Sequence, residues 1–231
     1  VGRPVGEGLA YDTTGTLRGR ETYRRGYTHG ELVWYDRHGK KAWTVPHSTG
    51  YRHGTAVQYD SLERKIHSIT FHKGTRHGPE IFYYPNGSIH YRVEYRYGQI
   101  HGTLRSYHTN GRIEWTGGYR DGEMHGERIL KDSTGTLHNG EYLTTFPSGM
   151  GRYRVACTQG RPHGELIMQR NDSSLSCTGR YENGRPEGEF LYFDREGKVY
   201  RKAHFENGVF IRATRRGVDG GHTPQPYELQ L

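Results

Sequence analysis

The sequence predicts an all-β fold: an elongated single-layer antiparallel β-meander of about eight 24-residue hairpin repeats. Three observations predict it. They are glycine pairs with a fixed period, short stretches of alternating apolar and polar residues, and an unusual composition. Only 31% of the 231 residues are hydrophobic, yet the chain holds 19 Tyr, 7 Phe and 3 Trp. Disordered chains are poor in aromatic residues, so this composition indicates a thin structure that buries its rings locally.

A Gly-x-x-x-Gly pair is the main repeat signal, because a fixed period marks a repeat architecture. Successive pairs begin 24 residues apart, as Gly26 and Gly50 do, and the exception is the interval of 38 residues between Gly122 and Gly160. Insertions in repeat arrays often lie on a binding face, and the alternative is a loop that the fold tolerates. We therefore predict one array over residues 1–212 and a tail over 213–231, with an insertion near 139–151 and repeats that start near residues 2, 26, 50, 74, 98, 122, 160 and 184.

Each repeat is predicted to form a β-hairpin. Its first strand alternates with period two, as in Leu32-Val33-Trp34-Tyr35. A turn follows, as in Asp12-Thr-Thr-Gly15 or Asn110-Gly111; Asp can bond the turn backbone and Gly can adopt a positive φ. The Gly-x-x-x-Gly segment then links one hairpin to the next. Two strands per repeat predict roughly 16–18 strands, stabilised by contacts between neighbouring repeats.

A Gly-x-x-His-Gly segment, an aromatic strand and an Asn-Gly turn follow one another in Gly74-Thr-Arg-His-Gly-Pro-Glu-Ile-Phe-Tyr-Tyr-Pro-Asn-Gly87. This pattern resembles the MORN repeat family, and more closely its bacterial second variant, over residues 2–208. Proteins similar to this include antitoxin or immunity components of bacterial toxin systems, and standard MORN proteins are associated with membrane attachment and scaffolding. The resemblance implies a repeat scaffold; a fold of this kind does not by itself specify a function.

Residues with reactive side chains follow the repeat rather than forming a site. Six histidines share one repeat column, whose members lie two strands apart, about 9–10 Å, whereas metal ligands lie about 2.0–2.1 Å from a shared ion. We expect these imidazoles to pack on rings and to bond the turn backbone. Carboxylates of a second column are explained by turn formation. We therefore predict no catalytic residue, metal or cofactor, and a chain that is not an enzyme. The histidine column holds His29, His53, His77, His101, His125 and His163, and the carboxylate column holds Asp12, Asp36, Asp60, Asp132 and Asp194.

The two cysteines leave two possibilities open. Cys157 lies at the end of one repeat and Cys177 in the middle of the next. They can form a disulfide across neighbouring repeats or remain free as small hydrophobic residues.

Two columns of aromatic residues are the candidate binding residues. The first-strand column alternates with the Val and Tyr columns, so its side chains are predicted on the opposite face of the sheet; the other column lies on the second strand. A single layer cannot bury both faces well, so one face is expected to expose rings interleaved with Arg, as protein interfaces do. The alternative is that these rings pack on Arg and Lys stems of neighbouring strands. The candidates are Trp34, Phe82 and Tyr192 on first strands, and Trp43, Tyr91 and Trp115 on second strands.

The net charge of +8 favours acidic partners. The leading hypothesis is a non-enzymatic, antitoxin- or immunity-like scaffold that binds an acidic protein through an extended β surface. An anionic membrane surface is the alternative partner, and nucleic acid is less favoured because the basic residues are dispersed. The chain starts at Val1 rather than Met; this favours an extracytoplasmic location and leaves a cytoplasmic one open. The pattern does not determine the oligomeric state.

Overall fold

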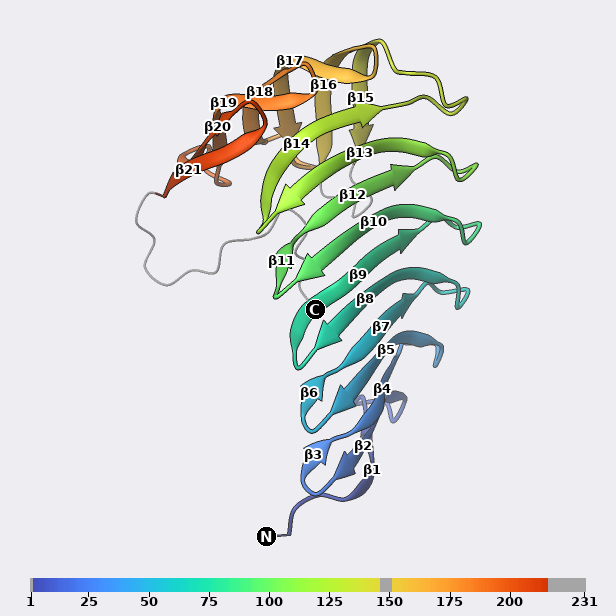
Figure 1. The fold of residues 1–231 in the computed structure, drawn as a ribbon. Coiled ribbons are helices and arrows are strands. Elements are labelled where there is room, and N and C mark those ends of the chain that lie inside the picture. The colour runs from blue at the N-terminus through green and yellow to red at the C-terminus, as the bar shows by residue number, and fades with distance from the viewer. Residues whose placement is uncertain (1, 146–150, 216–231) are drawn as a thin grey trace. The chain divides into compact units, whose positions relative to one another are not determined.

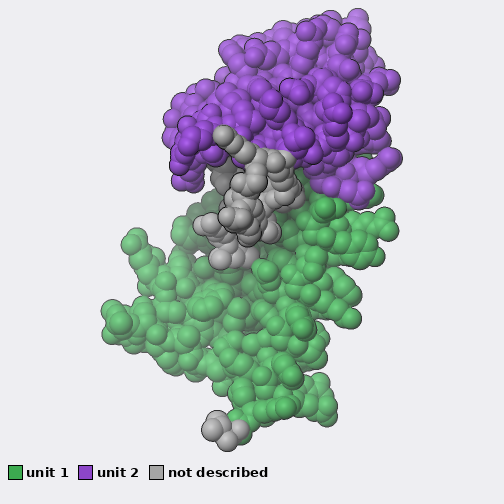
Figure 2. Space-filling view, turned by 90° about the vertical axis from the view of Figure 1, so that its left-hand side faces the viewer, with its two compact units in different colours: residues 1–111 green, residues 112–231 purple. Residues whose placement is uncertain are grey.

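The computed structural model describes residues 2–145 and 151–215, which form β-strands and turns. The chain divides into two compact units, unit 1 (Val1–Gly111) and unit 2 (Arg112–Leu231), which Figure 2 colours green and purple. The predicted all-β, antiparallel fold is confirmed. None of the described residues forms a helix that is long and apolar enough to cross a membrane.

Unit 1 is an antiparallel meander whose long strands lie side by side in chain order (Figure 1). Three two-residue strands, β3, β6 and β11, extend the hairpins of β2, β5 and β10. Together they explain why there are more strands than two per repeat. The strands are β1 (Gly6–Tyr11), β2 (Leu17–Arg24), β3 (Tyr27–Thr28), β4 (Gly30–Tyr35), β5 (Lys41–Ser48), β6 (Tyr51–Arg52), β7 (Gly54–Tyr59), β8 (Lys65–His72), β9 (Thr75–Tyr83), β10 (Ile89–Arg96), β11 (Gln99–Ile100) and β12 (Gly102–Tyr107).

Unit 2 contains a hairpin of β13 and β14 and a seven-stranded antiparallel sheet of β15 to β21, again in chain order. β15 belongs to the predicted insertion and pairs with β16 from Gly140↔Cys157 to Thr145↔Arg152. The described part of the insertion is therefore a strand of the sheet. The strands are β13 (Ile113–Arg120), β14 (Glu123–Leu130), β15 (Gly140–Thr145), β16 (Arg152–Thr158), β17 (Arg161–Gln169), β18 (Leu175–Glu182), β19 (Arg185–Phe193), β20 (Val199–Glu206) and β21 (Val209–Arg215).

β21 ends three residues beyond the predicted array boundary, because it pairs with β20 as far as Arg215↔Arg201. The rest of the predicted tail, residues 216–231, lies outside the described residues.

The two glycines of the repeat have different backbone roles. The first is the second residue of a two-residue turn in which both φ angles are positive, the type I′ geometry; Lys73 (φ 48°) and Gly74 (φ 83°) form one such turn. The second, such as Gly78 (φ 103°), lies where the register between β8 and β9 shifts. A β-bulge at this point needs a residue that tolerates positive φ, which explains why both glycines recur.

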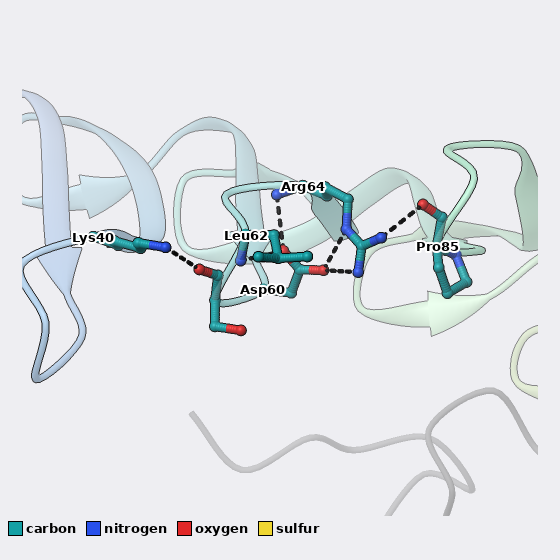
Figure 3. Close-up of polar contacts among 6 residues, drawn as sticks. Lys40, Asp60, Leu62, Arg64 and Pro85 are labelled. Atoms are coloured by element: carbon teal, nitrogen blue, oxygen red, sulfur yellow. Dashed lines mark hydrogen bonds and ion pairs between the residues drawn. The ribbon is translucent and has the colours of Figure 1, made fainter.

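Neighbouring repeats are linked at both edges of the unit 1 sheet. At one edge, each type I′ turn donates a backbone N–H to the preceding repeat, as from Gly74 to the Arg52 carbonyl (2.8 Å). At the other edge, Lys40 donates to the Ser61 carbonyl (2.7 Å) and Arg64 to the Pro85 carbonyl (3.4 Å), as Figure 3 shows. Stability in this unit therefore comes largely from contacts between nearest neighbours.

The hairpin turns form as predicted. Asp12 accepts backbone N–H groups from Thr14 (2.9 Å) and Thr16 (3.0 Å). The Thr14 hydroxyl also donates to this carboxylate and, as the largest cause, holds the pKa of Asp12 below its ordinary value. These contacts account for the carboxylate column through backbone structure alone.

Candidate functional site

The four predicted binding residues of unit 1 lie on one face of its sheet, and all six candidates differ in exposure. The registers Trp34↔Trp43 and Phe82↔Tyr91 place first-strand and second-strand rings together. Only Trp34 is well exposed, at 45%, whereas Phe82, Tyr91 and Trp115 are at most 9% exposed; Trp43 and Tyr192 are partly buried. The expected open aromatic face is therefore wrong for most of these positions, because rings from adjacent strands cover one another.

A row of rings is formed by residues of β5, β8, β9 and β10 in unit 1. Trp43 contacts His67 edge-on (centroids 5.9 Å), His67 stacks on Phe82 (4.3 Å), and Phe82 meets Tyr91 edge-on (6.3 Å). Such pairs each contribute roughly 0.5–1.5 kcal/mol beyond area burial. The row therefore serves first as core packing.

A buried acid–base pair lies within this row. His67 Nε2 is 2.8 Å from Glu80 Oε1, and the side chains are 4% and 1% exposed. Arg76 Nη1 lies 3.8 Å from Glu80 Oε2 and 3.2 Å from the Tyr95 hydroxyl. Burial, and then the charge of Glu80, raise the pKa of Tyr95. Most other repeats have an apolar residue or Gly at the Glu80 position, the second exception being Arg128, so Glu80 is a specific departure from the repeat.

Unit 2 buries an arginine among aromatic rings. The Arg128 guanidinium lies within 5.2–5.9 Å of the ring centroids of four aromatic residues, and it donates to the Tyr119 hydroxyl (2.7 Å). Similarly, Arg201 lies 4.7 Å from the Tyr192 ring and pairs with Glu123. For Trp115 and Tyr192 this is the alternative arrangement considered from the sequence, in which rings pack on arginine. The four rings around Arg128 are Trp115, Tyr119, Tyr153 and Tyr181.

β14 lies across the type I′ turns of the seven-stranded sheet. Its N–H groups at Gly126, Arg128 and Leu130 each donate to the carbonyl of a turn glycine, at 2.8, 2.7 and 2.7 Å. The acceptors belong to three successive repeats, and β14 packs beside β17, β19 and β21 (Figure 1). The N–H donors along this edge of β14 are thus bonded to a row of turns rather than to another strand. In the order of the three donors, the acceptors are Gly208, Gly184 and Gly160.

The turns of unit 1 carry a concentrated positive charge. We define the turn edge of unit 1 as residues 24–29, 48–53, 72–77 and 96–101. It contains six Arg or Lys residues and no Asp or Glu, for a formal charge of +6. The equivalent segments of unit 2, residues 120–125, 158–163, 182–187 and 206–211, contain three basic and five acidic residues, for a formal charge of 3 − 5 = −2. Three exposed tyrosines interleave with these charges. They are Tyr27, Tyr51 and Tyr97, at 53%, 58% and 75% exposure.

The sequence pattern did not predict the turn edge, because the basic residues are dispersed along the chain. Arg25, Arg52 and Arg76 are separated by 24 residues or more in sequence, yet the sheet places successive turns side by side. Charge counted by repeat position, rather than along the chain, would have found this surface.

The histidines follow the predicted packing in part. His77 lies beside the Tyr97 ring (5.4 Å), and His72 lies between His53 (5.0 Å) and His77 (6.0 Å). One imidazole bonds a turn as predicted, because His163 Nδ1 accepts a hydrogen bond from the Asn183 backbone N–H (3.4 Å). His53 instead bonds through its main chain, from its N–H to the Pro46 carbonyl of β5 (2.8 Å). Within residues 2–145 and 151–215, no group of three or more His, Cys, Asp or Glu could hold a metal ion.

Cys157 and Cys177 are free and buried, so the alternative without a disulfide holds. The register Tyr153↔Met168↔Cys177 places Cys177 level with Tyr153, four residues along the strand from Cys157 and two strands away. That separation exceeds the reach of a disulfide. Burial raises the pKa of Cys157 to about 11 and that of Cys177 to about 12.

A hollow of about 370 Å³ lies in unit 2 beside β14. Several of its polar side chains bond one another: Arg161 pairs with Glu127, and Arg185 donates to the Asn207 amide oxygen (2.6 Å). The hollow is therefore lined by polar side chains of β14 and the turns.

Comparison with known proteins identifies the repeat. The sequence model of a family described as "MORN repeat variant" matches residues 76–97 and 186–207, so the resemblance to MORN repeats is confirmed. No curated protein matches the chain.

Several solved structures show distant similarity. The Photorhabdus luminescens Tc holotoxin pore is 12% identical with a TM-score of 0.23, over 87% of this chain and 12% of that chain. A structure of TcdB2-TccC3-TEV is 14% identical with a TM-score of 0.20, over 91% and 12%. A porin-like protein from Bacteroides uniformis is 10% identical with a TM-score of 0.17, over 90% and 89%. This chain therefore spans only 12% of the length of the first two.

Proposed function

We propose that this chain of MORN repeat variants is a non-enzymatic scaffold that binds an acidic protein partner, in the manner of an antitoxin or immunity protein. MORN repeats of this kind are all-β scaffolds that commonly serve binding. The observation that carries the proposal is the turn edge of unit 1, where six cationic side chains and three exposed tyrosines occur without a carboxylate. Aromatic residues and Arg are the types enriched at protein interfaces.

The charge of this edge selects the class of partner. Complementary potentials speed association and exclude like-charged partners. A basic partner, such as a basic nuclease toxin, would be repelled by a surface of charge +6, so the proposed partner presents acidic residues. A surface formed by tyrosine and arginine can also bind anionic lipid or single-stranded nucleic acid. Binding to either of these is the competing outcome of the test.

The test is a pull-down from the native lysate at physiological and at high salt, with mass spectrometry of the bound proteins. We expect one dominant acidic protein that survives high salt, and its loss when the bait carries Arg52→Gln with Lys73→Gln. A matched bait with Arg37→Gln and Lys41→Gln, exposed residues of the opposite edge, should retain it. Recovery of lipid, nucleic acid or a salt-labile mixture would overturn the proposal in favour of binding through charge alone.

A further inference from the structure

We infer that the turn edge of unit 1 binds an extended acidic segment of its protein partner by β-type backbone hydrogen bonds to the carbonyls of Gly50, Gly74 and Gly98, as β14 does within unit 2. This inference rests on the proposed function and specifies how the partner is held.

β14 shows what the turn row can bind. Every second residue of this strand donates its N–H to a turn glycine, so five consecutive residues, Gly126 to Leu130, bridge three repeats. The residue between the first two donors, Glu127, pairs with Arg161 of the adjacent turn. An extended segment that donates alternate N–H groups, with a carboxylate between two of the donors, is therefore already accommodated once in this protein.

The same acceptors are present in unit 1. Gly50 (φ 85°), Gly74 (φ 83°) and Gly98 (φ 83°) have the turn conformation of Gly184 (φ 84°). No described residue donates a hydrogen bond to their carbonyls, whereas Gly160, Gly184 and Gly208 each accept one from β14. Successive turns are linked by the same hydrogen bond in both units, from Gly74 N–H to the Arg52 carbonyl in unit 1 and from Gly184 N–H to the Pro162 carbonyl in unit 2, both at 2.8 Å. A strand that crosses the turns of unit 1 can therefore bond several acceptors in sequence, as β14 does.

The side chains beside these carbonyls are cationic and can bind carboxylates. Arg52 lies over the Phe71 ring (4.3 Å), and Arg76 lies over the Tyr95 ring (5.3 Å), so both guanidiniums are held beside the turns. Burial, and then the charge of Arg76, lower the pKa of Arg52. Arg76 has Glu80 at 3.8 Å, but among described residues no carboxylate lies within 4.0 Å of Arg52. A carboxylate from a bound segment would relieve this repulsion.

Backbone pairing distinguishes a peptide from other anions. Phosphate groups of lipids and nucleic acids accept hydrogen bonds, so they cannot satisfy a row of carbonyl acceptors. A β-strand edge supplies N–H donors on one side, with same-side residues about 6.6–6.8 Å apart. Strand addition of this kind takes affinity from the main chain and specificity from the side chains. The acceptor row and the positive charge together therefore favour an acidic peptide segment.

The probe is an N-terminally labelled eight-residue peptide in which Thr and Glu alternate, titrated into the full chain and followed by fluorescence anisotropy. In the β14 arrangement the residues on either side of the carboxylate-bearing Glu127 donate the N–H groups, and Thr takes their place in the probe. We therefore expect N-methylation of the Thr amides to weaken binding at least tenfold, and N-methylation of the Glu amides to change it less than threefold. Equal effects of the two methylation patterns would overturn the backbone pairing.

Protein variants locate the site. Arg52→Gln with Lys73→Gln should weaken peptide binding at least tenfold, and the matched Arg37→Gln with Lys41→Gln should leave it within twofold, with thermal unfolding confirming that both variants fold. A single-stranded oligo(dT), or vesicles with anionic lipid, that binds more tightly than the peptide with the same dependence on Arg52 would overturn the assignment to a peptide.

The two proposals fail separately. A captured protein whose retention depends on Arg52 and Lys73, combined with a peptide that is insensitive to the position of methylation, would keep the scaffold function and reject β-type docking. Methylation-sensitive peptide binding without any salt-resistant protein partner would keep the docking mode and reject the proposed function.

Discussion

Gly179→Ala should destabilise unit 2 by overpacking. A Cβ at this position would lie 2.4, 2.5 and 2.6 Å from ring carbons of Phe190, whereas ordinary contact begins near 3.4 Å, so the ring must retreat by about 3.4 − 2.4 = 1.0 Å. Phe190 is fully buried and held between Tyr181 (centroids 5.9 Å) and Phe205 (4.9 Å). It therefore has no free space into which it can move.

The expected magnitude follows from two opposing effects. Overpacking of a close-packed core typically costs about 1–3 kcal/mol, and Gly→Ala recovers about 0.4–1 kcal/mol by restricting the unfolded chain. The free energy of unfolding should therefore fall by about 1–2 kcal/mol, which lowers the Tm by roughly 4–8 °C for a domain of this size. Urea unfolding followed by intrinsic fluorescence, together with thermal unfolding, measures both quantities.

Gly19→Ala is the matched control. Its Cβ would lie 3.1 and 3.2 Å from ring carbons of Trp34, but that ring is 45% exposed and can swing aside, so we expect a change within about 0.5 kcal/mol. Phe190→Leu should in turn relieve the Gly179→Ala clash, giving a coupling of at least about 1 kcal/mol in a double-mutant cycle. A fully stable Gly179→Ala, or strictly additive losses, would refute the packing argument.

Three further predictions concern ionisable groups. His67→Phe alone should lower the free energy of unfolding by about 3–5 kcal/mol, because it leaves Glu80 buried without its partner. The double variant His67→Phe with Glu80→Leu should restore or exceed wild-type stability. Urea unfolding of both variants measures this, and a destabilised double variant would contradict it. Because Cys157 and Cys177 have pKa values raised by burial to about 11 and 12, a thiol reagent at pH 8 should label the native chain at least about tenfold more slowly than the unfolded chain, and rapid native labelling would show that these thiols are accessible. Hydrogen bonds lower the pKa of the turn carboxyls of Asp12, Asp36, Asp60, Asp132 and Asp172. The stability that these carboxylates contribute is therefore present above the unfolded pKa of about 3.9 and is lost as the pH falls through the lower folded values. Acid titration of the Tm should show a decline that begins near pH 4, and a Tm that rises on acidification would show that the assigned sign is wrong.

Local pattern was enough to predict the repeat and its hairpins. The type I′ turns and bulges need a positive φ, so a glycine pair such as Gly74 and Gly78 marks them directly in the sequence. The period of two along a strand also predicted that Phe82 faces away from its strand neighbours Ile81 and Tyr83. These features depend on residues within one repeat or in adjacent repeats, so they can be predicted from the sequence.

Burial and charge clustering depended on contacts that no local pattern encodes. The hydrogen bond from Gly126 to Gly208 joins residues 208 − 126 = 82 positions apart, and it brings β14 onto the turns and Arg128 among the rings. The same is true of the turn edge of unit 1, where the sheet gathers basic residues from four successive turns of the chain. Repeat period and strand alternation are properties of neighbouring residues, whereas the exposure of a ring or the field of a surface is set by every segment that packs beside it.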